Sequence, residues 1–383
     1  MPSGSSGTTA KRFNFRIMAL TVYFFGSLPN GVEPYYGGGE VGNKRTVDML
    51  RQFGFKVRIV RKLRCKATTS RLVKVATYPF RFAMAILGFA TVLLFGSRKA
   101  IVHISGFYGP TILCEYILVE LANLLRYKII YEIRGECVEA YQTTGFKFQR
   151  ICFARILRVA KSIFSQGIES EQFLRSFTKN PIFHYPNYVE EGYMPSVLPQ
   201  KPQGVVNLIY FGRIEPQKNV SLIVEVASIL QKSIDISLTI IGKGKHAYVD
   251  DMVQQMEQTL KPGTYTFISG YARIGIRTLL LDKHFLIFPS AREGQSNSIT
   301  ESMSCGVVPV SSPQGFSRTV IGNNRLIVNE LSAQAYADRV LEILSDGSFN
   351  GLSQFVYERI KSNYTQAVIE PKLREQYERL AGE

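Results

Sequence analysis

Two segments of this chain open with the same succession of elements, an apolar strand, a polar loop, a helical pattern and a second strand. These elements fall at 15–26, 31–42, 43–53 and 56–60 in the first segment, and at 205–212, 213–219, 220–232 and 236–241 in the second. Strand–helix–strand order is typical of parallel sheets covered by helices. The length of 383 residues also favours two domains over one. We therefore predict an α/β protein with two doubly wound domains facing each other across a deep cleft.

A proline-rich stretch separates the two halves. Residues 184–204 contain four prolines and show little hydrophobic periodicity, which indicates a linker. The predicted parts are a disordered tail at 1–14, an N-terminal domain at 15–185, a linker at 186–204, a C-terminal domain at 205–360 and a last helical segment at 361–383. The small polar residues at the start do not have the pattern of a secretory signal.

The positive charge of the chain is concentrated in the N-terminal domain. Of a net charge of +16, residues 1–200 contribute 27 basic and 12 acidic side chains, whereas residues 201–383 contribute 19 and 18. The segment 51–99 holds 12 basic residues, and no acid occurs between Asp48 and Glu115. Such a charge first suggests a nucleic-acid binder. No nucleic-acid-binding motif accompanies it, so we expect no nucleic acid partner.

The basic segment leads into an uncharged apolar run of 15 residues, Phe82 to Gly96. A spanning helix needs about 20 apolar residues, so the run is too short to cross a bilayer comfortably. A core helix and an in-plane membrane segment both fit its length, and both hold if one helix face is buried while the other meets lipid. We expect an anionic membrane surface to be a partner of 51–99, because nearby Lys and Arg side chains are attracted to anionic lipid.

The cysteines point to a reducing compartment. Five are scattered through the chain without a CxxC or a Cys/His cluster, which predicts reduced thiols and no zinc site. We expect a cytoplasmic protein, associated peripherally with the inner face of the cytoplasmic membrane.

Two short motifs follow strands of the C-terminal domain. Arg213 and Lys218 lie just past a strand end, where open α/β sheets bind ligands, and both can form charge-assisted bonds with phosphate. The glycines of IIGKGK, Gly242 and Gly244, allow a backbone to approach a ligand closely. Solvated loop cations and an ordinary glycine turn are the alternative interpretations.

The third motif is the most specific. In FPSAREGQSNSITESMSCGVVPVSS, Glu293 and Glu301 are separated by seven residues. A loop of small polar residues lies between them and enters a helix near Ile299; its members are Gly294, Gln295, Ser296, Asn297 and Ser298. Backbone N–H groups at a helix start favour an anion. Two carboxylates placed around such a start can each accept hydroxyl hydrogen bonds, so the motif indicates a ligand with two sugar rings and phosphates between them.

Together these motifs resemble the retaining glycosyltransferases of family 4, which have the GT-B fold of two Rossmann-like domains. The resemblance rests on the glycine-rich loop near Gly37, the GRxxxxK element, the GxG turn and the E-x7-E element, which occur in that order. The segment Pro186–Tyr193 also resembles the family's linker, which carries an Asn. The resemblance extends from about Ile17 to Leu380. It implies a C-terminal helix that crosses back to the N domain. The members that this chain resembles are of the bacterial surface-polysaccharide, O-antigen type.

The resemblance implies a role for each matching residue. Arg213 and Lys218 hold the donor diphosphate and stabilise the leaving group, Glu293 contacts the transferred sugar and Glu301 holds the ribose. The remaining donor-binding positions are Gly242, Tyr271 at the nucleobase, Gly294, Gln295, Ser296, Asn297 and Ser298. Gly37, Gly38, Gly39 and Glu40 form the N-domain loop near the diphosphate and acceptor. The implied donor is a UDP- or GDP-sugar, with no further cofactor and no metal, and no DxD element occurs.

One departure from the family pattern concerns the N domain. Where many members carry a His, this chain has Arg134 in YEIRGE. Arg134 can bind a phosphate of donor or acceptor, or form a structural salt bridge with Glu132 or Glu136. His103, which we place at the end of the preceding strand, is either the alternative ring near the cleft or a satisfied loop histidine. No catalytic base is assigned.

The function that these features favour is metal-independent hexosyl transfer from a nucleotide-diphosphate sugar to a polyprenyl-diphosphate-linked saccharide. A catalytically impaired nucleotide-sugar-binding scaffold is the alternative, suggested by Arg134. Another GT-B activity, such as a sugar phosphorylase or an epimerase, finds no support in the motifs.

Overall fold

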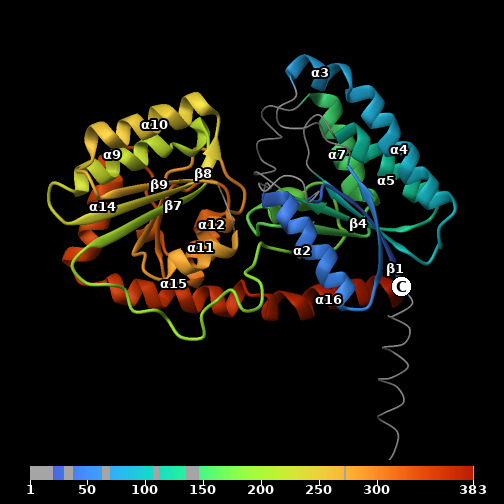
Figure 1. Ribbon diagram of the computed structural model, residues 1–383. Coiled ribbons are helices and arrows are strands. Elements are labelled where there is room, and N and C mark those ends of the chain that lie inside the picture. The colour runs from blue at the N-terminus through green and yellow to red at the C-terminus, as the bar shows by residue number, and fades with distance from the viewer. Residues whose placement is uncertain are drawn as a thin grey trace, which may run out of the picture. The chain divides into compact units, whose positions relative to one another are not determined.

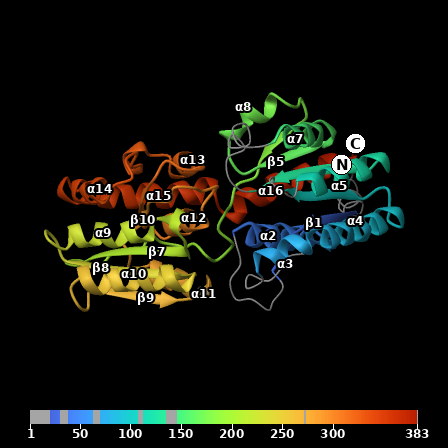
Figure 2. The same ribbon diagram turned by 90° about the horizontal axis from the view of Figure 1, so that it is seen from above.

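The computed structural model describes residues 20–29, 38–62, 70–106, 112–134, 146–270 and 273–382. The chain divides into two compact units: Met1–Tyr185 with Glu370–Glu383, and Pro186–Ile369. Each unit holds one sheet in which every strand pair is parallel, as Figures 1 and 2 show. The prediction of two Rossmann-like parallel-sheet domains is therefore confirmed. The predicted tail at 1–14 lies outside the described residues.

The first unit is built on a six-stranded sheet of order β2-β1-β3-β4-β5-β6. Its strands are β1 (Thr21–Gly26), β2 (Lys56–Arg61), β3 (Ile101–Gly106), β4 (Lys128–Ile133), β5 (Ser162–Ser165) and β6 (Ile182–His184). Its helices are α2 (Gly38–Gln52), α3 (Arg71–Ala76), α4 (Tyr78–Leu94), α5 (Ile112–Leu124), α7 (Lys147–Val159), α8 (Ser170–Arg175) and the end of α16 (Gln366–Gly382). The inner strands are mostly apolar and buried, because both faces of a parallel sheet are covered, whereas edge strand β2 reads KVRIVR with exposed basic residues.

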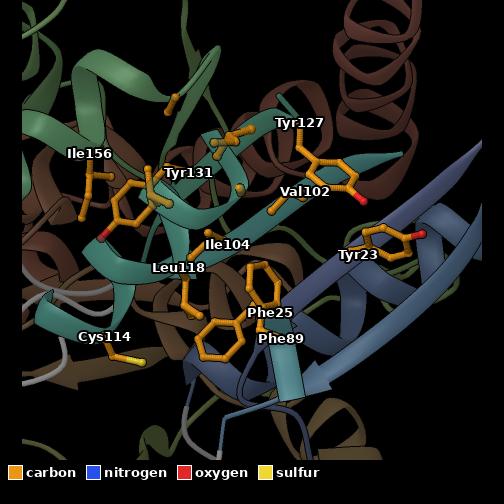
Figure 3. Close-up of a cluster of buried hydrophobic side chains, with 14 of the residues drawn as sticks. Tyr23, Phe25, Phe89, Val102, Ile104, Cys114, Leu118, Tyr127, Tyr131 and Ile156 are labelled. Atoms are coloured by element: carbon orange, nitrogen blue, oxygen red, sulfur yellow. The ribbon is translucent and has the colours of Figure 1, made fainter. Parts of the chain in front are cut away.

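A hydrophobic core fills the space between this sheet and the layer of α4, α5 and α7. Phe25 of β1 packs edge-to-face on Phe89 of α4, with ring centroids 5.7 Å apart, and Leu118 of α5 and Ile156 of α7 join the same cluster (Figure 3). Burying such side chains stabilises the fold by about 1.5–3 kcal/mol each. Helix α2 lies on the other face of the sheet (Figure 1).

Two helices of this unit differ from the sequence prediction. Helix α2 begins at Gly38 rather than Asn43, so Gly38, Gly39 and Glu40 form its first turn instead of a loop. Helix α4 begins at Tyr78, with a proline in its first turn, a position that proline tolerates well. The apolar run from Phe82 thus lies in a helix of 17 residues that ends at Leu94, two residues before the run does.

The second unit is built on a five-stranded sheet of order β11-β10-β7-β8-β9. Its strands are β7 (Val206–Ile214), β8 (Ile236–Gly244), β9 (Tyr265–Ser269), β10 (Phe285–Phe288) and β11 (Val308–Ser311). Its helices are η1 (Pro216–Lys218), α9 (Val220–Leu230), α10 (His246–Thr259), α11 (Arg273–Leu280), α12 (Asn297–Ser304), α13 (Ser317–Ile321), η2 (Asn324–Leu326), α14 (Ala333–Ser345) and α15 (Phe349–Asn363). The loops that follow β7 and β10 leave the same edge of the sheet, because parallel strands end side by side.

Candidate active site

Lys218 and Glu293 lie together at the carboxyl edge of the second sheet. Lys218 ends η1 after β7, and Glu293 follows β10. Asn219 takes the left-handed conformation (φ 50°), and its Nδ2 donates to Pro289 O at 2.8 Å. This turn directs Lys218 inward, where its Nζ forms an ion pair with Glu293 Oε2. The pair joins two residues that are 75 positions apart.

The ion pair is nearly buried and its ammonium is fully satisfied. The side chains of Lys218 and Glu293 are 9% and 15% exposed. An ammonium has three donors, and Lys218 Nζ also reaches Arg292 O at 3.2 Å and Ser290 Oγ at 3.4 Å. A buried charge needs such partners to offset its desolvation. The arrangement holds one cation and one carboxylate at fixed positions beside a sheet edge.

Arg213 lies apart from this pair. It belongs to β7, which extends to Ile214, rather than to a loop. Its Nη1 is 3.1 Å from Glu215 Oε1, and the side chain is 46% exposed. Exposed ion pairs contribute little to stability, so this guanidinium can change partner at low cost.

Gly242 and Gly244 serve strand pairing. Both lie within β8, which runs on to Gly244, and not in a turn after residue 241. A Cβ at Gly242 would stand 2.0 Å from Gly212 O, and one at Gly244 would stand 2.0 Å from Ile214 O. The backbone of β7 therefore approaches these glycines closely, and the predicted turn is a continuation of the strand.

Helix α12 begins at Asn297 and includes Ser298, so the loop between the glutamates is two residues shorter than predicted. Ser296 is the residue that precedes the helix and is buried. Ser298 Oγ donates to Phe211 O at 2.7 Å, which ties the helix start to the end of β7. Gly294 O accepts from Phe316 N at 3.2 Å. The first N–H groups of α12 lack intrahelical acceptors and lie on the same chain segment as Glu293.

Glu301 lies in the second turn of α12 rather than in the first. Its side chain is 1% exposed, and its Oε2 accepts from Tyr193 OH at 3.4 Å. Tyr193 is itself held by Arg277, whose Nε donates to Tyr193 O at 2.6 Å. Tyr193 is thus a neighbour of the second glutamate that the sequence motif did not indicate.

A reciprocal contact fixes the loop that carries Glu293. Asn187 N donates to Gln295 Oε1 at 2.5 Å, Gln295 Nε2 donates to Asn187 O at 3.0 Å, and Asn187 Nδ2 donates to Gln295 O at 2.9 Å. Both residues are buried. Both polar atoms of the Gln295 side chain bond the backbone of Asn187. Gln295 therefore lies in the predicted donor loop, but its side chain is engaged in this contact. The Pro-Asn dipeptide after the last strand of the first half was the only signal of this contact in the sequence.

In the first unit, Arg134 forms the structural salt bridge that was one of its two interpretations. Its Nη2 is 2.6 Å from Glu132 Oε1 and 3.0 Å from Thr46 Oγ1. Gly42 makes room for it, since a Cβ there would lie 1.8 Å from Arg134 Nη1. Arg134 is 3% exposed, so its guanidinium is part of the packing between β4 and α2.

His103 does not end its strand. It is the third residue of β3 and is fully buried; its Nε2 lies 3.1 Å from Glu132 Oε2, and its Nδ1 bonds the Tyr377 hydroxyl of α16. Burial acts to raise the pKa of Glu132, but Arg134 and His103 together hold it below its usual value. The ring is a satisfied core histidine, because side chains in the middle of a central parallel strand are covered on both faces.

Gly37 and Tyr271, two further predicted site residues, lie outside the described residues. In the part of the chain that the structure describes, no group of three or more His, Cys, Asp or Glu side chains is placed to hold a metal ion. Within the same part, none of the helices has the length and apolarity needed to span a bilayer.

The fold and this edge of the second sheet define a class of protein. The chain is similar to sucrose-phosphate synthase from Thermosynechococcus elongatus, with a TM-score of 0.73 and 15% identity over 95% of this chain and 99% of that one. It is also similar to HepE from Anabaena, solved in complex with UDP, with a TM-score of 0.67 and 12% identity over 94% of this chain and 99% of that one. These likenesses show the GT-B fold.

Sequence comparisons indicate the class of reaction. Residues 199–370 match the family described as glycosyl transferases group 1; the match covers the second unit from residue 199 onward and includes the Lys218–Glu293 pair. The chain is 25% identical to the O-antigen chain mannosyltransferase B of Escherichia coli over 146 residues, 38% of this chain and 38% of that protein. The chain therefore matches well under half the length of this curated relative. The family match and the fold together support a glycosyltransferase of the GT-B fold.

Proposed function

We propose that the chain is a retaining, metal-independent hexosyltransferase of family 4 that transfers a sugar from a UDP- or GDP-sugar to a polyprenyl-diphosphate-linked saccharide in polysaccharide assembly. The observation that carries the proposal is the meeting of Lys218 and Glu293, from separate strand ends, beside the start of α12. One cation for a diphosphate and one carboxylate for a sugar hydroxyl are held side by side there. The match of residues 199–370 to glycosyl transferases group 1 supports it.

The donor diphosphate is proposed to bind Lys218 and Arg213. An incoming phosphate competes with Glu293 for the Lys218 ammonium and with Glu215 for the Arg213 guanidinium, both of which donate to carboxylates. As the bond to the sugar breaks, negative charge grows on the diphosphate, and fixed cations stabilise that charge more than they stabilise the ground state. The N–H groups at the start of α12 add to the same field.

The released Glu293 carboxylate is proposed to accept hydroxyl hydrogen bonds from the transferred sugar. The same event thus frees the group that recognises the sugar, so diphosphate and sugar are bound together. Glu301 is proposed to hold the ribose in place of the Tyr193 hydroxyl, which donates to it at 3.4 Å. The remaining loop positions, Gly294 to Ser298, offer backbone N–H groups rather than side chains.

The acceptor is proposed to be lipid-linked, and the protein to lie in the cytoplasm against the inner face of the membrane. The support is the acid-free basic stretch at 51–99, which contains the apolar helix α4. A saccharide carried on a membrane lipid stays at the bilayer surface, so an enzyme that docks there meets its acceptor at high local concentration.

A nucleotide-sugar-binding scaffold without turnover is the second candidate. Arg134 stands where many family members have a His, and it is buried in a salt bridge with Glu132. Such a scaffold would bind the donor and release no product with any matched acceptor.

The deciding experiment combines donor binding with transfer. Nucleotide sugars are screened by thermal shift, because a ligand that binds the folded state raises the unfolding temperature by mass action. The best donor is then offered to membrane extracts that contain lipid-linked saccharides, with and without a chelator. A thermal shift and a radiolabelled lipid product that survives the chelator support the proposal. Binding without product favours the scaffold, and full transfer by Lys218→Ala would contradict the assigned role.

A further inference from the structure

Helix α4 is apolar on its outer face as well as on its inner one. Ala85, Phe89, Val92 and Leu93 face the core and are buried. The opposite stripe exposes Phe80 (69%), Met84 (44%), Leu87 (60%) and Leu94 (54%). These positions recur at helical spacing and form one continuous face. Helices of a water-exposed layer normally carry polar residues there, so this face has a partner other than water.

The neighbouring helices extend this face. Helix α3, which leads directly into α4, exposes Leu72 and Val75. At the start of helix α7, the preceding residue Phe146 and the helical residues Phe148 and Ile151 are exposed by 77%, 48% and 61%. In parallel β–α units each helix starts at the carboxyl edge of the sheet, so the first turns of α4 and α7 share one edge. Helix α5 packs against both α4 and α7, and the three lie side by side in Figures 1 and 2.

We infer that the exposed apolar faces of α3 and α4 and the aromatic start of α7 form one surface that inserts between the headgroups of an anionic lipid bilayer. We call it the docking surface. The inference deepens the proposed function by naming the residues that hold the enzyme at the membrane, and it rests on that function for its purpose. It adds α7, outside the basic segment 51–99, as a second point of contact.

The charges around the docking surface favour anionic lipid. Lys147 and Arg150 are exposed in the first turns of α7, and Arg98 and Lys99 are exposed just beyond α4. The adjoining edge strand β2, which α4 contacts, exposes Lys56, Arg58 and Arg61. Basic side chains around an apolar face are attracted to anionic headgroups while the apolar residues enter the acyl boundary.

The acids of this layer do not oppose that charge. Among the described residues of α3, α4, α5 and α7 the only acids are Glu115 and Glu120. Glu115 is buried, 3.1 Å from Lys62 Nζ, and accepts from Tyr131 OH at 2.7 Å; Glu120 lies 2.6 Å from Arg155 Nε. A second copy of the chain would place basic residues against basic residues. A lipid surface avoids that repulsion, which is why it is the occupant we infer.

The test is flotation of the full chain with vesicles of phosphatidylcholine alone or with added phosphatidylglycerol. Leu87→Glu probes α4 and Phe148→Glu probes α7; Val197→Glu, at a 75% exposed apolar residue of the second unit, is the matched control. All three sites are exposed, so thermal unfolding should be unchanged. We expect binding only to anionic vesicles, loss at 1 M salt, where charges are screened beyond about 3 Å, and at least about tenfold weaker binding for Leu87→Glu and Phe148→Glu only.

Several outcomes would overturn the inference. Equal binding to neutral vesicles would show that the partner is not an anionic lipid. Wild-type binding by Phe148→Glu would show that α7 does not contact the bilayer. Equal losses for Val197→Glu and Leu87→Glu would show that the docking surface is not where the protein binds. Absence of vesicle binding together with a dimer that Leu87→Glu dissociates would assign the face to a second copy. Nucleotide-sugar binding, measured by thermal shift without vesicles, is independent of docking, so its failure would count against the proposed function alone.

Discussion

Lys218 and Glu293 form an ion pair that brings the ends of β7 and β10 together at one edge of the second sheet. Two side chains that we assign to different parts of the donor thus neutralise each other. A ligand that binds Lys218 through phosphate must loosen its bond with Glu293, and this competition couples recognition of the diphosphate to recognition of the sugar.

We predict that Lys218→Met and Glu293→Gln each lower transfer at least about 100-fold, as expected when a group that stabilises developing charge or positions the substrate is lost. Lys218→Met also leaves the mostly buried carboxylate without its cation, at a cost of about 3 kcal/mol in the free energy of unfolding. The double variant should regain part of that stability without regaining transfer. Chemical denaturation and a transfer assay measure the two effects, and additive stability losses would show that the pair is not coupled.

The contact between Asn187 and Gln295 should set the position of the Glu293 loop. Gln295→Ala removes two side-chain hydrogen bonds to Asn187 and leaves buried backbone groups unsatisfied, so we expect about 1–3 kcal/mol of destabilisation and weaker donor binding. Asn187→Ala should act in the same way, and the double variant should lose less than the sum. Titration calorimetry with the donor checks this, and unchanged donor affinity in Gln295→Ala would disprove the positioning role.

Gly242→Ala should damage the second unit, because the added methyl would meet Gly212 O at 2.0 Å. Forced overpacking of this kind costs about 1–3 kcal/mol or more. Gly275→Ala is the matched control. It lies in α11 with no atom within 4 Å of the added carbon, and a helical Gly→Ala change stabilises by about 1 kcal/mol. Opposite shifts in unfolding temperature are expected, and equal shifts would contradict the strand-packing role.

Lys201 should make stability depend on pH. Its Nζ donates to Leu280 O, Leu281 O and Cys305 O at 2.9–3.1 Å, and burial lowers its pKa from 10.5 to about 8. Between these two values the unfolded chain binds the proton that the folded chain releases, so this group adds stability as the pH rises from about 8 to 10.5. The free energy of unfolding of the wild type, measured in urea titrations, should therefore rise over that window relative to that of Lys201→Met. A constant difference would refute the shifted pKa.

Acid should weaken the first unit through Glu132. Although burial opposes ionisation, Arg134 and His103 hold the pKa of this carboxyl below its ordinary 4.5. Its contribution is therefore present above pH 4.5 and is lost as the pH falls through the lower folded value. Glu132→Gln should flatten that loss, whereas Glu358→Gln, on the exposed surface of α15, should not. Acid unfolding followed by circular dichroism separates the two.

The sequence alone predicted the two parallel-sheet domains, because buried strands of Val, Ile and Phe alternate with helical patterns and leave little choice of architecture. It also singled out the two glutamates and the lysine as candidate site residues from their residue types and spacing. It failed where a side chain's neighbour decides its role. His103 lies buried in mid-strand instead of at a strand end, and Gly242 lies within β8, against the backbone of β7, instead of in a turn.

The tertiary structure decided two matters that no local pattern contains. Lys218 and Glu293 are 75 positions apart, and only the side-by-side ends of β7 and β10 make them a pair. The apolar run of α4 was compatible with a core helix and with a membrane helix. Packing on α5 and β2, with Phe89 against Phe25 of β1, buries one face and leaves the other exposed, because a helix in a single outer layer has a sheet on one side only.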